Sequence, residues 1–154
     1  YGGRQFASFD QGWVGWFCKK AIEQKSALEK GLPLASFAIS GTGKQVRDVL
    51  HGDDIIRLYR AAFESRDILR GEVLNVGGGV ENSLSLLELF DLLSELLNMP
   101  LLVYEKTPRR TSDQDCFVAS IRKVKQVLGW EPNIRFKTGV SQMLDWTISN
   151  CSIN

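Results

Sequence analysis

Two arginines are the residues of this sequence best suited to bind a doubly charged anion. Arg47 follows a Gly-Thr-Gly turn and stands in an alternating stretch, between Val46 and Val49, that is typical of a strand. A strand would fix the direction of its guanidinium group, which can bind phosphate through two parallel hydrogen bonds. Arg110 follows Arg109 in a polar segment later in the chain. That pair alone is better explained as a solvated loop, but together with Arg47 it predicts a clamp that holds a diphosphate from two sides.

His51 is the single histidine of the chain and suggests a second kind of chemistry. A catalytic histidine needs a nucleophile or an orienting carboxylate, and no serine or cysteine motif accompanies His51. We therefore favour a structural histidine, hydrogen bonded near the start of the next helix, over a catalytic one. Asp53 and Asp54 are adjacent carboxylates at that helix start, where capping and the helix dipole explain them better than acid–base catalysis. No catalytic residue is assigned from these patterns.

A run of three glycines, Gly77-Gly78-Gly79, follows the apolar stretch 72–76, which we predict to be a strand. Glycines after a strand can belong to a dinucleotide-binding turn. The spacing here does not fit G-x-G-x-x-G, and the next predicted helix begins several residues later. We interpret the run as a loop in which another part of the backbone approaches closely.

The three cysteines, Cys18, Cys116 and Cys151, are widely spaced and include no C-x-x-C pair. This spacing indicates neither a metal site nor a disulfide framework. Free thiols are typical of a reducing compartment. Cys18 stands beside Trp16 and Phe17, so we interpret it as a buried packing residue, with a reactive thiol as the alternative.

The composition is that of one globular unit. The chain has 154 residues, 44% of them hydrophobic and 24% charged, and we predict a single domain over residues 1–154. A formal net charge of +1 argues against nucleic-acid binding, which usually needs a clustered basic excess. No apolar run has the length of a membrane span and no signal-peptide pattern opens the chain, so we expect no membrane partner and a cytoplasmic location. Because Tyr1 stands where a methionine would begin a chain, we expect a fragment or a trimmed chain.

Strands and helices alternate along the chain, which predicts the α/β class. Gly41 and Gly43 are expected to reverse the chain so that two strands form a hairpin. The predicted strands are 37–40, a stretch around Arg47, 72–76, 101–104 and 117–119, and the predicted helices are 10–25, 53–66, 85–98, 121–128 and one from residue 138. The predicted helix-end signals are caps at Asp10, Ser120 and Thr138, a capping box of Ser85 with Glu88, and a stop at Gly129.

Several segments resemble a known family, the extended short-chain dehydrogenases of the NAD-dependent epimerase/dehydratase group. Residues 41–54 resemble its sugar-nucleotide-binding segment, and residues 73–79 resemble its late Rossmann strand and turn. Arg110 opens a stretch similar to its C-terminal signature, which continues through Ser-Asp-Gln, Phe-Val-Ala-Ser and Leu-Gly-Trp-Glu-Pro. Residues 1–6 and 10–17 resemble, more narrowly, the members that epimerise CDP-linked hexoses at the second carbon.

The resemblance implies a fold and a set of ligand contacts. The fold would be the C-terminal substrate-binding half of an extended Rossmann-type fold, lacking most of the parallel sheet. Arg47 and Arg110 would contact the diphosphate of a nucleotide sugar, with a CDP-hexose favoured. The other implied substrate contacts are Phe37, Ala38, Ile39 and Ser40 beside the pyrimidine and Gln5 near the sugar, and the implied cofactor contacts are Tyr1 and Gly2.

The narrower resemblance implies a bound NAD that oxidises the sugar at its second carbon and returns the hydride to the opposite face. The family carries a glycine fingerprint and a Tyr-x-x-x-Lys pair for this reaction, and the chain has neither. Tyr59 is followed four positions later by Phe63, and Tyr104 by Pro108. The resemblance therefore implies that the dinucleotide-binding half is absent, and that this chain alone neither catalyses the reaction nor holds NAD.

Two alternatives to a substrate-binding portion of a CDP-hexose epimerase stay open. The chain could be a non-catalytic nucleotide-binding or protein-interaction module with the same half-fold, or part of a different nucleotide-sugar epimerase or dehydratase. Without the missing strands, the segment 73–76 and the helices 10–25 and 85–97 would expose apolar surface. Open sheet edges and apolar patches favour association, so we expect a homo-oligomer.

Overall fold

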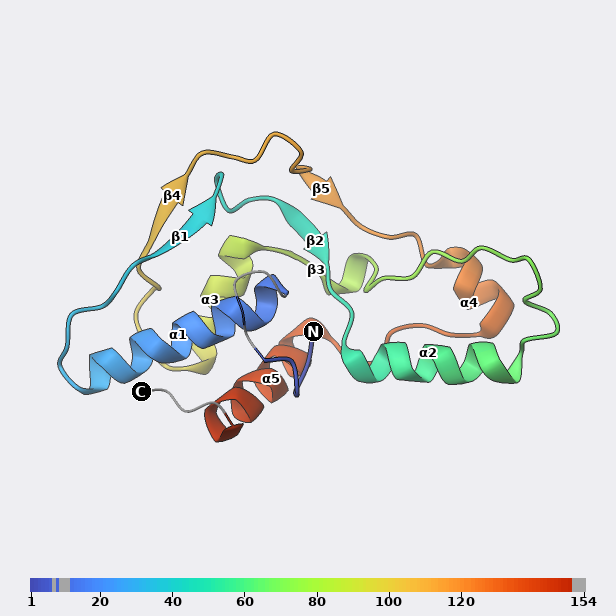
Figure 1. Ribbon diagram of the computed structural model, residues 1–154, viewed down its shortest axis with the longest axis horizontal. Helices are drawn as coiled ribbons and strands as arrows, with labels where there is room; N and C mark the ends of the chain where they lie inside the picture. The colour runs from blue at the N-terminus through green and yellow to red at the C-terminus, as the bar shows by residue number, and fades with distance from the viewer. Residues whose placement is uncertain (7, 9–11, 151–154) are drawn as a thin grey trace.

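The structure, a computed structural model, describes residues 1–6, 8 and 12–150 (Figure 1). The chain is α/β, as predicted. Its helices are α1 (Trp13–Glu29), α2 (Gly52–Glu64), α3 (Leu86–Leu96), α4 (Arg122–Leu128) and α5 (Phe136–Asn150), with a short 3-10 turn, η1 (Val80–Asn82). Its strands are β1 (Phe37–Ser40), β2 (Val46–Asp48), β3 (Ser83–Ser85), β4 (Tyr104–Thr107) and β5 (Cys116–Phe117).

The strands form two small sheets, and the predicted hairpin is wrong. β1 pairs in parallel with β4, whereas β2 pairs antiparallel with β3 and parallel with β5. Gly41 and Gly43 do adopt positive φ angles of 77° and 80°, but they carry the chain from one sheet to the other. The Gly41 N–H donates to the Thr107 carbonyl at 2.9 Å, and the Leu87 N–H donates to the Gly43 carbonyl at 3.2 Å. The turn is therefore held by β4 and α3, and the strands that it joins are not paired with each other.

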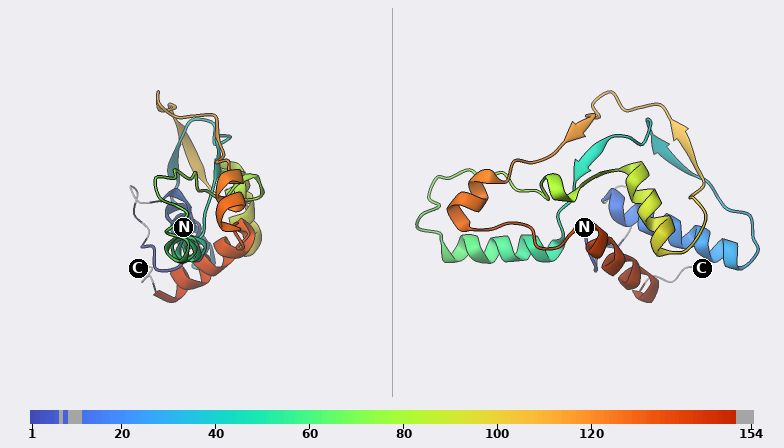
Figure 2. Two further views of the ribbon diagram at one scale, coloured as in Figure 1. Left: turned by 90° about the vertical axis from the view of Figure 1, so that its right-hand side faces the viewer. Right: turned by 180° about the vertical axis from the view of Figure 1, so that it is seen from behind.

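The main core lies between α1, α3, α5 and β1, which Figure 2 shows gathered at one end of the molecule. An aromatic group at its centre joins Phe17, Phe37, Phe90 and Tyr104, with ring centroids 5.0 to 6.2 Å apart. Cys18 is fully buried here and burial raises the pKa of its thiol to about 12, which confirms its interpretation as a packing residue.

A second, smaller core lies at the other end of the molecule. Leu58 of α2, Val124 of α4 and Trp130 are each at most 5% exposed and pack together. α2 and α4 thus form an arm that extends away from the main core (Figure 1). The predicted segment 53–66 is confirmed as this helix, with ends that differ by one or two residues.

Some helix-end predictions are confirmed and others are wrong. The capping box is present, since the Ser85 hydroxyl accepts from the Glu88 N–H and the Glu88 carboxylate accepts from the Ser85 N–H. Gly129 ends α4 with a left-handed φ of 62°. Ser120 does not cap α4, because Ile121 occupies the N-cap position. The predicted cap Asp10 lies outside the described residues.

The last helix begins before its predicted cap at Thr138. α5 starts at Phe136, whose N–H donates to the buried side-chain oxygen of Asn82 at 2.9 Å. A partner more than fifty positions earlier in the chain thus replaces the local cap that the sequence suggested.

The predicted strand at 72–76 is also wrong as a paired strand. Within the described part of the chain, no segment forms a ladder with it. Leu74 and Val76 pack against the smaller core, while Val73 is 79% exposed. The alternating pattern is that of a strand, but a strand requires a neighbour. The predictions 101–104 and 117–119 are each displaced from the observed β4 and β5 by a few residues.

Candidate functional site

A cavity of about 780 Å³ lies where the N-terminal end of α1 meets β1, β2 and the segment after β4. Its lining includes Arg47 and Arg110, as well as Ala38, Ile39 and Ser40 of β1, Trp13 and Trp16 of α1, Gln45 and Asp113. We call it the Arg47–Arg110 cavity. The structure therefore brings together two arginines far apart in sequence and most of the strand predicted to contact a base.

Arg47 is held by the protein itself. Its Nη2 donates to the Asp113 carboxylate at 2.6 Å and to the Gln114 carbonyl at 2.8 Å, and its Nη1 donates to the Val46 carbonyl at 2.7 Å. A guanidinium group has five N–H donors, so two remain without a partner among the described residues. The sequence predicted a guanidinium group aimed at a phosphate pair, whereas in the structure this group forms an ion pair with Asp113.

Arg110 differs from both Arg109 and Arg47. Arg109 forms an ion pair with Asp115 at 2.6 Å and donates to the Asp113 carbonyl, also at 2.6 Å. The side chain of Arg110 makes neither a hydrogen bond nor an ion pair with any described residue, and Arg110 lines the cavity. Arg110 thus supplies the uncompensated positive charge of the site.

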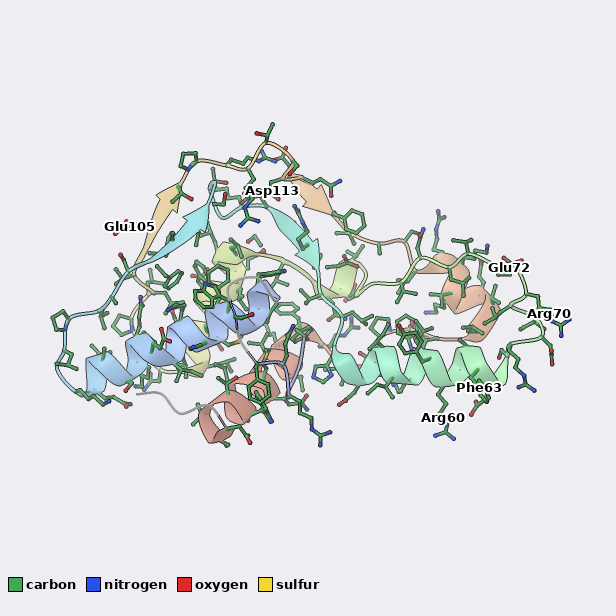
Figure 3. All side chains as sticks on the ribbon, viewed as in Figure 1. Arg60, Phe63, Arg70, Glu72, Glu105 and Asp113 are labelled. Carbon is green, nitrogen blue, oxygen red and sulfur yellow. The ribbon has the colours of Figure 1, made fainter. Side chains whose placement is uncertain are left out.

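Gln45 connects the two sides of the cavity and was not predicted. Its Nε2 donates to the Ser40 carbonyl at 3.1 Å and to the second carboxylate oxygen of Asp113 at 2.9 Å. Asp113 therefore joins Gln45 to Arg47, in the segment between β4 and β5 where Figure 3 labels it. Its spacing from Arg47 could have indicated this position. Residues two apart on an extended chain point to the same side, so Gln45 lies on the same side as Arg47.

The remaining predicted contacts lie elsewhere. Phe37 is 7% exposed and points into the aromatic core, so it does not line the cavity. Gln5 packs its side-chain amide against Gly12, which belongs to the cavity lining. The substrate roles of these two residues remain predictions.

Tyr1 and Gly2 pack against the start of α2. The Tyr1 ammonium group donates to the Leu50 carbonyl at 3.0 Å, and its ring meets His51 edge-on at 5.3 Å. Burial raises the pKa of the Tyr1 hydroxyl far above its ordinary value. At Gly2, an added Cβ would lie 3.0 Å from the His51 Nε2. Neither residue lines the Arg47–Arg110 cavity, and their predicted cofactor role stays untested.

His51 is structural, as predicted. It is 5% exposed, and its Nδ1 accepts from the Asp53 N–H at 3.2 Å as the N-cap of α2. Burial lowers the pKa of its imidazole below the ordinary value of 6.5. The cap leaves His51 no role at the cavity.

Asp54 is a buried structural carboxylate. It is 0% exposed and accepts from Arg57 at 2.7 Å and from the N–H groups of Asn133 and Ile134 at 3.0 to 3.2 Å. Burial alone would raise its pKa, but these hydrogen bonds outweigh burial and hold the pKa below its usual range. The prediction that the two adjacent carboxylates are not an acid–base pair agrees with this arrangement, since Asp53 points to solvent.

The three glycines lie in a loop that packs closely against β2 and its neighbours. At Gly77 an added Cβ would collide with the Asp48 carboxylate, and at Gly78 with the Val49 carbonyl. The Gly79 N–H donates to the Asp48 carboxylate at 3.0 Å. The close backbone approach predicted for this loop is confirmed.

With this geometry in view, comparison with known proteins identifies the family. Residues 17–143 match the family model described as GDP-mannose 4,6 dehydratase. The chain belongs to this family. Its members include NAD-dependent epimerases and dehydratases of nucleotide sugars, which confirms the resemblance stated from the motifs.

Among relatives of this dehydratase family, the CDP-paratose 2-epimerase of Salmonella typhi is 51% identical over 97% of this chain and 42% of its own length. The UDP-glucose 4-epimerase of Thermotoga maritima, solved with UDP-glucose, is 25% identical with a TM-score of 0.74, covering 97% of this chain and 43% of its own. The UDP-glucuronic acid 4-epimerase of Bacillus cereus, solved with UDP-glucuronic acid and NAD, has a TM-score of 0.74 at 24% identity, over 97% of this chain and 42% of its own.

The chain spans less than half the length of these relatives. It has the fold of part of such an epimerase, in agreement with the predicted half of an extended Rossmann-type fold. Among the helices of the described residues, none combines the length and the apolar character needed to cross a bilayer.

Proposed function

We propose that this chain is the nucleotide-sugar-binding portion of an NAD-dependent 2-epimerase that acts on a CDP-linked hexose. The observation that carries the proposal is the cavity that gathers Arg47, Arg110 and β1, in a chain 51% identical to a CDP-paratose 2-epimerase. A volume of about 780 Å³ is within the range of small-molecule sites.

The cavity offers a separate contact for each part of the ligand. Arg110 supplies an uncompensated charge for the diphosphate, and Arg47 supplies two free N–H donors in a fixed direction. Ala38 and Ser40 of β1 lie beside the pyrimidine. Trp13 and Trp16 line the same cavity and offer aromatic surface on which a base can stack.

The chain by itself is proposed to bind and not to catalyse. It contains neither G-x-G-x-x-G nor Tyr-x-x-x-Lys, so NAD and the proton-transfer pair would come from another part of the enzyme. When bound, NAD supplies oxidation and re-reduction of the sugar carbon, while the residues of this chain hold the nucleotide. A cytoplasmic location is proposed with it, because the substrate is a nucleotide sugar and the sequence favours reduced thiols.

A second candidate is a site for a UDP-sugar. The observation that favours it is the likeness to the UDP-glucose 4-epimerase of Thermotoga maritima, solved with UDP-glucose. The diphosphate contacts would be the same, so only the base distinguishes the two candidates.

Isothermal titration of the chain with CDP, UDP and dTDP tests the proposal. We expect CDP to bind most tightly, and Arg110→Ala to weaken it about tenfold, because one charge-assisted interaction is lost. Arg70→Ala is the matched control, since Arg70 is exposed at the far end of the arm (Figure 3). Selective UDP binding would favour the second candidate. Absence of binding by all three nucleotides, with a cooperative thermal transition, would overturn the proposed role of this chain.

A further inference from the structure

Asp113 places a carboxylate in a cavity whose proposed ligand is an anion. The charged residues that line the Arg47–Arg110 cavity are the two arginines and Asp113. The neighbouring Arg109 and Asp115 form an ion pair at 2.6 Å, so together they add little net charge. Asp113 therefore cancels half of the positive charge that the two cavity arginines supply. Because a carboxylate repels phosphate, attraction of the ligand alone does not explain its position.

Two side chains hold the Asp113 carboxylate in the cavity. One of its oxygens accepts from Arg47 at 2.6 Å, and the other accepts from the Gln45 Nε2 at 2.9 Å. The carboxylate cannot turn away from the cavity without breaking both contacts. The Asp113 side chain is 25% exposed, so water and salt screen its charge less than that of a fully exposed carboxylate.

The backbone places Asp113 and the unpaired arginine of the cavity on one turn. The Asp113 N–H donates to the Arg110 carbonyl at 3.1 Å, and the Asp113 carbonyl accepts from Arg109 at 2.6 Å. Asp113 and Arg110 both line the cavity from this turn, in the segment between β4 and β5 (Figure 3). A phosphate held by Arg110 would therefore lie within the electric field of the Asp113 carboxylate.

The charge of the ligand depends on whether its terminal phosphate carries a sugar. The terminal phosphate of a free nucleoside diphosphate has a second pKa of about 6, so at pH 8 it carries about two negative charges. Esterification of this phosphate with a sugar removes one of these charges. Two arginines without a carboxylate would favour the more highly charged free nucleotide, because attraction grows with the charge of the ligand. Asp113 repels the additional charge and so reduces this advantage.

We propose that Asp113 is a specificity-determining residue that lowers the affinity of the cavity for a free nucleoside diphosphate relative to a diphosphate ester. The proposal rests on the function proposed above, since it requires a diphosphate bound by Arg47 and Arg110. The class of ligand to which the cavity is matched is a nucleoside diphosphate whose terminal phosphate is esterified. Gln45 is the positioning residue that keeps the carboxylate in the cavity.

Isothermal titration at pH 8 with CDP and with the methyl ester of its terminal phosphate tests the proposal. The two ligands share the base, the ribose and the diphosphate, and the methyl group removes the additional charge. Asp113→Asn keeps the size of the side chain without its charge. We expect this variant to improve CDP binding at least threefold more than binding of the methyl ester. The difference should shrink in about 0.5 M salt, which screens the repulsion.

Asp67→Asn is the matched control for Asp113→Asn. Asp67 is also a carboxylate paired with an arginine, since it lies 3.4 Å from Arg70 at the far end of the arm (Figure 3). The control changes the net charge by the same amount, and we expect it to leave both affinities unchanged. Asp113→Ser is a second neutral variant and should shift the ratio of the two affinities in the same direction. Thermal melts establish that each variant is folded.

The ratio of the two affinities decides the outcome. An equal change for both ligands in the folded neutral variants would show that Asp113 only holds Arg47 in place, and would overturn the proposal. An equal shift of the ratio in Asp67→Asn would overturn it as well, because the effect would then follow from net charge. If the unaltered chain binds neither ligand, the proposed function fails and this proposal with it. Binding of both ligands with an unchanged ratio overturns this proposal alone.

Discussion

Replacing each arginine of the cavity should have unequal effects, because only one of them is already paired. The guanidinium group of Arg110 has no partner among the described residues, so Arg110→Ala removes only its contacts with the ligand. Because Arg110 is exposed, water screens part of the interaction, and we expect CDP binding to weaken about tenfold, near the lower end of a charge-assisted contact.

Arg47→Ala should cost more. It removes the contacts of Arg47 with the ligand and also leaves Asp113, its partner at 2.6 Å, as an uncompensated carboxylate in the cavity. Repulsion between that carboxylate and a phosphate at contact distance is about 1 kcal/mol in a well-solvated site. Added to a lost charge-assisted contact, this predicts binding about 100-fold weaker than that of the unaltered chain.

The double variant Arg47→Ala, Asp113→Asn separates the two contributions. Asn has the size of Asp without its charge, so the double variant should bind CDP about fivefold more tightly than Arg47→Ala alone. Isothermal titration at fixed salt measures all four proteins, and thermal melts establish that each is folded. The reasoning is refuted if Arg47→Ala costs no more than Arg110→Ala, or if removal of the Asp113 charge recovers nothing.

Other predictions concern stability and association. Because burial lowers the pKa of His51 below 6.5, its contribution to stability is complete above pH 6.5 and declines as the pH falls toward the folded-state pKa. His51→Asn keeps a cap acceptor but does not titrate, so its melting temperature should change less between pH 7 and pH 5, and an equal decline would contradict this. Asp54→Asn should lower the free energy of unfolding by about 3 kcal/mol in denaturant titrations, because Asp54 is buried and paired with Arg57. The exposed control Asp53→Asn should lower it by less than about 0.5 kcal/mol. Gly78→Ala places a Cβ on the Val49 carbonyl and should lower the free energy of unfolding by about 3 kcal/mol. In the control Gly52→Ala, the added Cβ meets only the Tyr1 carbonyl, 3.7 Å away, so this variant should be tolerated. Equal melting temperatures of the two variants would count against this packing argument. The chain alone should scatter light as a species larger than 17.3 kDa at micromolar concentration, and a clean monomer would show that its exposed apolar surfaces do not self-associate.

The features that the sequence predicted well depend on residues close together in the chain. The capping box of Ser85 with Glu88 spans a single helical turn, and the cap at His51 involves a neighbour two positions away. These signals are local hydrogen bonds, so they do not depend on how distant elements pack. The motif around Arg47 also lies within one short segment, so its resemblance to the family could be read from the sequence.

The features that it missed depend on distant partners. The pairing of β1 with β4 and of Arg47 with Asp113 joins residues more than sixty positions apart, and no pattern within one segment specifies either. Gln45 was overlooked because its role appears only when Asp113 is beside it. At 72–76 the alternation is correct for a strand, yet a strand is defined by a neighbour that the described residues do not provide.

β2 links the cavity to the glycine turn 77–79. Alternation along an extended chain sends Arg47 and Asp48 to opposite sides. Arg47 binds Asp113 at the cavity, whereas the Asp48 carboxylate accepts from the Gly79 N–H at 3.0 Å and from the Ala119 N–H at 3.2 Å. The Asp48 carboxylate therefore fixes the glycine turn that directly follows the segment 73–76. Two consecutive residues of one strand therefore hold the cavity and the glycine turn in a fixed relation to each other.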